Sequence, residues 1–129
     1  MAITYKVVER GEPGVAGGGD KKYYAAAIST GDADIEDLTR RIEKISTVSG
    51  ADIRAVLYAL VDVMTDELAN GRIVRIGDLG DMRVSVSSEG AETDAEVTAA
   101  NITGARILFA PGRKLKDMLK TLTYQKAQQ

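Results

Sequence analysis

Basic side chains gather toward the C-terminal end of the chain. From Arg106 onward there are six basic residues and a single acid, Asp117. The basic residues are Arg106, Arg113, Lys114, Lys116, Lys120 and Lys126. Lys and Arg neutralise phosphate groups, which supplies most of the non-specific affinity of proteins for nucleic acids. The local charge therefore favours a phosphate-binding surface, although each residue taken alone also fits a solvated charge or an ion pair.

The segment of residues 85–103 has the opposite charge. It carries four acids, Glu89, Glu92, Asp94 and Glu96, and contains no Lys, Arg or Pro. An acid that faces phosphate repels it, at a cost on the order of 1 kcal/mol for each close pair in water. The formal net charge of −2 likewise disfavours a general packer of nucleic acid. Any phosphate contact is therefore expected outside this segment.

Other chemistries have little support. The chain has no His and no Cys, which removes the usual general base and the thiolate ligands of zinc. Asp34 fits helix capping, and Asp78 and Asp81 fit a turn. The acids of residues 85–103 lack the spacing of a calcium loop. We therefore expect no catalysis, no cofactor and no metal site.

The composition suits one small domain with extensions, at 129 residues. Hydrophobic residues make up 44% of the chain but aromatic residues only 5%, with one Phe and no Trp. The core must therefore consist of aliphatic side chains, as in a thin layer of helices on a sheet that shares its core with a second subunit. No leader pattern and no long apolar run occurs, so a cytoplasmic location without membrane contact is expected.

Two helices are predicted in the first half of the chain. Apolar residues at helical spacing indicate the first helix over about residues 34–47. Ser49 can cap a longer helix that ends at Asn70-Gly71. Its apolar positions form a wide stripe, which consists of Ile53, Val56, Leu57, Leu60, Val61, Met64 and Leu68. The stripe is more apolar than one thin sheet needs, which favours burial against a second subunit, with the core of a monomer as the alternative.

Strands are predicted on both sides of this helical hairpin. Residues 2–10 alternate in polarity, and residues 21–29 return as a second strand after a mobile loop. That glycine-rich loop, residues 11–19, lacks the Lys-Ser/Thr of a nucleotide-binding loop. In the tail, residues 122–126 could add an edge strand beside this N-terminal hairpin.

A second set of strands follows the helices. Residues 74–76 and 82–86 flank the turn at residues 77–80, with Arg75 and Arg83 on the faces opposite their apolar neighbours. Residues 85–103 read as an exposed arm. The next strand, residues 103–109, is expected to direct Ile107 and Phe109 inward and Arg106 outward. Pro111 and Gly112 end it, and a short basic helix follows.

The order of these parts resembles the bacterial histone-like HU and integration host factor family. Two motifs carry the resemblance, which covers about residues 34–121. Asn70 to Met82, NGRIVRIGDLGDM, matches the family's strand and glycine turn. Phe109 to Lys120, FAPGRKLKDMLK, matches its Pro-Gly-Lys helix. The remaining ends of the chain resemble the additions of an extended subgroup of that family.

The resemblance implies an intertwined homodimer with a saddle-shaped sheet, whose two β-arms embrace the minor groove of DNA and bend the duplex. Family arms are rich in Lys and Arg and carry a Pro that wedges between base pairs. Residues 85–103 depart from this pattern, so intercalation is not carried over. Basic residues on the body are carried over, at Arg113 and Lys114 before the helix and on the outer sheet face. The candidate DNA-binding residues are Arg75, Arg83, Arg106, Arg113, Lys114, Lys116 and Lys120.

We therefore expect an α+β protein with an HU-like fold. A helical hairpin would pack on a three-stranded antiparallel sheet with a β-arm and a short C-terminal helix. An N-terminal hairpin extension over residues 1–33, the HU-like domain over 34–121 and a tail over 122–129 are the expected parts. The expected function is that of a histone-like, nucleoid-associated protein that binds double-stranded DNA non-specifically as a homodimer. The alternative is a dimeric protein-interaction or assembly module that has lost DNA binding and meets a protein partner through its acidic arm.

Overall fold

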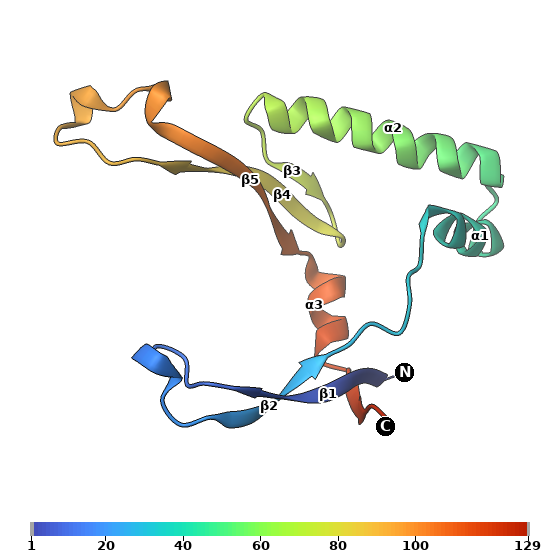
Figure 1. Ribbon diagram of the computed structural model, residues 1–129. Helices are drawn as coiled ribbons and strands as arrows, with labels where there is room; N and C mark the ends of the chain where they lie inside the picture. The colour runs from blue at the N-terminus through green and yellow to red at the C-terminus, as the bar shows by residue number, and fades with distance from the viewer. Residues whose placement is uncertain (1, 129) are drawn as a thin grey trace. The chain divides into compact units, whose positions relative to one another are not determined.

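The computed structural model describes residues 2–128 and has the α+β architecture predicted from the sequence (Figure 1). In chain order its helices and strands are β1 (Ala2–Arg10), β2 (Lys22–Ala27), α1 (Ile35–Ile45), α2 (Gly50–Ala69), β3 (Val74–Ile76), β4 (Gly80–Ser88), β5 (Ile102–Pro111), α3 (Arg113–Leu119) and β6 (Thr123–Lys126). The chain divides into two compact units. The central unit is Ile35–Met118, and the terminal unit combines the residues up to Asp34 with those from Leu119 onward.

The terminal unit joins both ends of the chain in one sheet of order β2-β1-β6. β1 and β2 form the predicted antiparallel hairpin, in which Tyr5 pairs with Ala27. β6 lies on the other side of β1 and runs parallel to it, with Ile3 paired to Tyr124. A parallel pair needs a long connection. Here the whole central unit provides that connection.

Helix α2 of the central unit begins and ends at the predicted caps. The Ser49 hydroxyl accepts a hydrogen bond from the backbone N–H of Asp52, which caps α2. At the other end Gly71 has a φ of +82°, and its N–H donates to the Leu68 carbonyl at 3.0 Å. A residue in this left-handed conformation satisfies the last helical carbonyls, and glycine adopts it without strain. Local sequence therefore determines the length of α2.

The central sheet has the order β3-β4-β5, and both pairs are antiparallel. β3 and β4 flank a tight turn at residues 77–79. Ile76 pairs with Gly80, so β4 begins at Gly80 and Asp81 lies within the strand. The interpretation of Asp81 as a turn residue was therefore wrong. The positive φ of Gly80 lets the chain enter the strand two residues earlier than the predicted start at residue 82.

Within one chain the central unit buries few apolar side chains. Among residues 2–128 the buried hydrophobic side chains are Ile53 and Leu68, both on α2. Val56, on the predicted stripe of the same helix, is 64% exposed. Ile107 and Phe109 were expected to point inward, but they are 62% and 48% exposed. They share the apolar face of the sheet with Met82 and the other even-numbered residues of β4, and that face is only partly covered by the single chain.

The β4–β5 hairpin continues beyond the sheet into the predicted arm (Figure 1). The ladder becomes irregular at Ser87 and Ser88. Beyond it the N–H of Glu89 donates to the carbonyl of Asn101 at 2.8 Å, which closes the base of the loop. Short 3-10 turns at Asp94–Glu96 and Ala99–Asn101 make up much of the loop. The arm is therefore a strand pair with a folded, polar tip.

Replacement of Gly80 by Ala tests the geometry of this sheet. A Cβ at Gly80 would collide with the carbonyl of Ala110 and approach the nitrogen of Gly112 to 2.9 Å, and the φ of +134° is itself unfavourable for Ala. We expect Gly80→Ala to lower the free energy of unfolding by about 2 kcal/mol or more, measured by chemical denaturation at a fixed protein concentration. Gly104→Ala is the matched control, because nothing lies within 4 Å of a Cβ there. A decrease no larger than that of the control would contradict the close packing of Gly80 against β5.

Candidate nucleic-acid interface

Three of the candidate arginines lie on one face of the central sheet. The register pairs Arg75 with Asp81, Arg83 with Leu108 and Arg106 with Ser85. Directly paired residues point to the same side of an antiparallel sheet, and alternate residues along a strand do so as well. Arg75, Arg83 and Arg106 therefore share the face opposite Met82 and Phe109. We call these three arginines the basic sheet face, and all three are exposed.

Arg75 is the one member of this face with an ion pair among the salt bridges of residues 2–128. Its Nη1 lies 2.8 Å from Oδ2 of Asp81, with the two side chains 65% and 29% exposed. Such a partly exposed pair contributes at most about 1 kcal/mol to stability, and it can be exchanged for a stronger anion. The sequence did not indicate Asp81 as the partner of Arg75, because Asp81 was interpreted as a turn residue and its pairing within β4 was not predicted. It reduces the net charge of the basic sheet face.

Helix α3 supplies a second basic group that starts close to the same sheet. Arg113, Lys114 and Lys116 lie on this helix and are exposed. The N–H of Gly112 donates to the Leu79 carbonyl at 3.1 Å, which holds the start of α3 against the β3–β4 turn. We call Arg113, Lys114 and Lys116 the basic helix group.

Glycine is needed at position 112 for this close approach. A Cβ there would collide with the backbone carbonyl of Asp78. The side chains that follow Gly112 therefore start from a defined point next to the turn. Lys120 is different, because it follows the last residue of α3 and belongs to the terminal unit.

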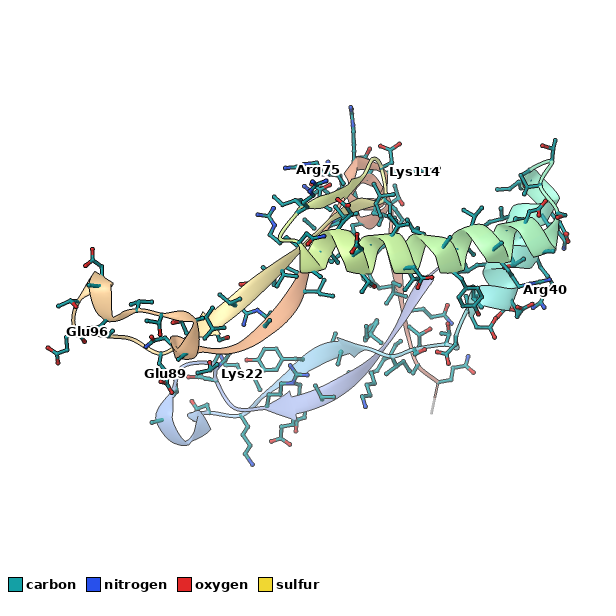
Figure 2. All side chains as sticks on the ribbon, turned by 90° about the horizontal axis from the view of Figure 1, so that it is seen from above. Lys22, Arg40, Arg75, Glu89, Glu96 and Lys114 are labelled. Atoms are coloured by element: carbon teal, nitrogen blue, oxygen red, sulfur yellow. The ribbon has the colours of Figure 1, made fainter. Side chains whose placement is uncertain are left out.

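The acids of the arm lie at the far end of the β4–β5 hairpin. Figure 2 shows Glu89 and Glu96 on the arm and Arg75 and Lys114 at the opposite end of the same hairpin. β4 has 9 residues, and at about 3.4 Å per residue it spans about 27 Å. The screening length at physiological ionic strength is about 8 Å. The arm therefore changes the potential at Arg75 and Lys114 very little, and among the candidates Arg106 is closest to its charge.

The described residues offer no obvious alternative chemistry. Between residues 2 and 128 there is no group of three or more His, Cys, Asp or Glu side chains that could hold a metal ion. In the same part of the chain, no helix combines the length and the apolar character required to cross a membrane. The groups of the central unit that could bind a ligand are the exposed basic side chains of the sheet and of the short helix α3.

The helical hairpin, the three-stranded sheet with its arm and the short C-terminal helix together define an HU-type fold. The chain belongs to the family of HU domains fused to a winged helix–turn–helix, Ig or glycine-rich motif, whose model matches residues 1–126. No curated protein matches the chain.

A solved structure supports the same fold. It is the crystal structure at 2.25 Å of a Bacteroides vulgatus protein, assigned provisionally as a bacterial DNA-binding protein. The similarity has a TM-score of 0.65 at 16% sequence identity, and it covers 98% of this chain and 50% of that chain. The present chain thus spans half the length of the Bacteroides protein. At this identity the likeness concerns the fold.

Proposed function

We propose that the protein is a histone-like DNA-binding protein that contacts the phosphates of double-stranded DNA as a homodimer. The observation that carries the proposal is the common face of Arg75, Arg83 and Arg106, continued by the basic helix group next to the β3–β4 turn. Guanidinium groups bind phosphate oxygens in a bidentate manner, and a row of them on a rigid sheet can follow a DNA backbone. Membership in an HU family supports DNA as the ligand.

The proposed contact is non-specific and uses the body of the fold. Contacts with phosphate groups fix the place of a protein on the duplex, but they carry no direct sequence information. The arm has neither the Lys and Arg nor the Pro with which HU-type arms enter the minor groove, and four acids take their place. We therefore assign no intercalation to this arm. Such a protein would act on the DNA of the nucleoid and bend it weakly.

The homodimer is inferred from apolar surface that a single chain leaves exposed. On α2 this surface includes Val56 and Val63, which are 64% and 60% exposed, and on β5 it includes Ile107 at 62%. Burial of one such side chain stabilises by about 1.5–3 kcal/mol. A soluble monomer with so much exposed apolar surface and so few buried side chains would be marginal. A second copy that covers α2 and the sheet would complete the core.

DNA contact by the basic helix group is tested with fluorescence anisotropy of a labelled duplex of about 30 base pairs. We expect binding that weakens steeply with salt, and an affinity at least about tenfold lower for the Arg113→Glu, Lys114→Glu double variant. The slope of log affinity against log salt should become shallower by about 0.9 for each phosphate that the variant no longer neutralises. Both effects follow from the removal of cations at the phosphate backbone.

The matched control carries the same change of charge elsewhere. Arg41 and Lys44 are exposed on α1, so the Arg41→Glu, Lys44→Glu variant has the same net charge as the test variant. If both variants bind equally weakly, net charge alone explains the effect and the proposed surface is wrong. If the natural chain does not bind DNA even at low salt, the dimeric protein-interaction module is favoured, for which the acidic arm is the specific observation.

Neutralisation of the arm tests its electrostatic separation from the body. In the Glu92→Gln, Asp94→Asn, Glu96→Gln variant we expect the affinity for the same duplex to change by less than about twofold at physiological salt. At low salt, where the screening length reaches about 30 Å, the variant should bind more tightly than the natural chain. A large gain at physiological salt would mean that the arm itself lies against the DNA.

The dimer is tested by sedimentation equilibrium. A charge placed on the exposed stripe of α2 would be buried at the proposed interface without a partner, which is strongly unfavourable. We expect Val56→Glu to reduce the mean mass of the protein by about half. Ala55→Glu, on the same helix and also exposed, should leave the mass unchanged. A natural chain that sediments as a monomer would exclude the dimer.

A further inference from the structure

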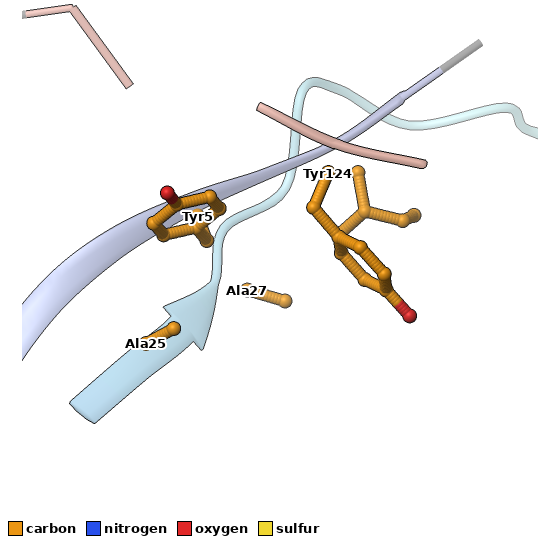
Figure 3. Close-up of a pocket in the computed structure, with 5 residues that line it drawn as sticks. Tyr5, Ala25, Ala27 and Tyr124 are labelled. Atoms are coloured by element: carbon orange, nitrogen blue, oxygen red, sulfur yellow. The ribbon is translucent and has the colours of Figure 1, made fainter. Parts of the chain in front are cut away.

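The terminal unit carries an apolar surface that is separate from the proposed DNA contact. The register of β1 with β2 and β6 places side chains of all three strands on one side of this sheet. Together they form what we call the tyrosine face: Ile3, Tyr5, Val7, Tyr23, Ala25, Ala27 and Tyr124. A depression of about 220 Å³ lies within it, lined by Ile3, Tyr5, Ala25, Ala27 and Tyr124 (Figure 3).

This face has no cover within the terminal unit itself. Tyr23 is 73% exposed, Tyr124 is 66% exposed and Val7 is 46% exposed. None of the described residues of the terminal unit is buried, so the sheet has no core of its own. Sheets of three strands become stable when one apolar face packs against another layer. The tyrosine face therefore requires an occupant.

The face has complementary features at its two ends. Along β1, Glu9 pairs with Tyr23, so one end presents an aromatic ring next to an acid. At the other end the depression lies next to Lys126, which pairs with Tyr5. Alanines in the floor leave room for a ring, and exposed tyrosines are frequent anchors in protein interfaces. One end thus offers a ring and a negative charge, and the other a hollow and a positive charge.

We propose that the tyrosine face binds the same face of a second copy of this chain. A two-fold axis that lies in the contact plane, above the part of β1 between Tyr5 and Val7, brings opposite ends of the two faces together, because a two-fold contact is self-complementary. Tyr23 of each copy then enters the depression of the other. Glu9 of each copy lies beside Lys126 of the other, and two aligned sheets pack face to face at about 10 Å.

This contact is additional to the homodimer proposed through α2. It uses different elements, so a chain that has both surfaces can join one copy through the central unit and another through the terminal unit. Two different two-fold contacts on one chain connect dimers with each other. Assemblies of this kind would hold two DNA segments together, whereas a single dimer contacts one.

A single thiol tests the contact directly, because the chain has no Cys of its own. We expect Val7→Cys, next to the proposed axis, to be joined to a second copy by a short bis-maleimide several-fold more efficiently than Lys6→Cys. Lys6 is the adjacent residue of β1 and points to the opposite face, so it is the matched control. The preference should persist in the Val56→Glu background, in which association through α2 is disrupted. Equal linking of the two thiols would overturn the proposal.

A charge exchange provides a second test that leaves the apolar surface intact. Glu9→Lys alone and Lys126→Glu alone should each weaken association of the Val56→Glu chain, by about threefold or more in sedimentation velocity. The variant with both changes should associate like the Val56→Glu chain with the natural pair, because the ion pair across the axis is restored with reversed polarity. If the double variant is as weak as the single variants or weaker, Glu9 and Lys126 do not meet across copies and the proposed packing is wrong.

Discussion

The antiparallel pairing of β4 with β5 is the interaction on which the arrangement of the central unit depends. It runs from the pair Gly80–Pro111 to the pair Ser88–Ile102. Because side chains alternate along a strand, a slip of one residue would exchange the two faces of the sheet. The observed register puts Phe109 on the apolar face and Arg106 on the opposite one. The same ladder separates the acidic tip of the arm from the basic residues at the other end.

The scarcity of buried side chains is the second constraint. A chain whose described residues bury Ile53 and Leu68 as its hydrophobic core, and which has a single Phe, gains little stability from its own interior. Its apolar side chains lie instead on α2, on the two sheets and in the hollow between Tyr5 and Tyr124. In the proposed dimer, folding and association would be linked, because burial of these surfaces supplies free energy that the monomer lacks.

The acidic residues of the arm and the basic residues of the body lie at opposite ends of the β4–β5 hairpin. The arm keeps the strand pairing expected of an HU-type arm, while its tip carries acids that repel phosphate. Over the length of β4, screening makes the two ends electrostatically almost independent. In the proposed function, the body attracts phosphate even though the chain as a whole has a net charge of −2. In the proposed contact, phosphate would compete with the carboxylate of Asp81 for Arg75.

Much of the fold could be predicted from the sequence, because helix caps and the alternation of strands depend on residues a few positions apart. Ser49, Asn70-Gly71 and Pro111-Gly112 marked the ends of their elements, and the two glycine motifs identified the fold by their order. The tertiary structure alone decided which residues meet. The pairing of Arg75 with Asp81, the exposure of Ile107 and the parallel direction of β6 along β1 depend on contacts between distant segments, which local periodicity does not encode.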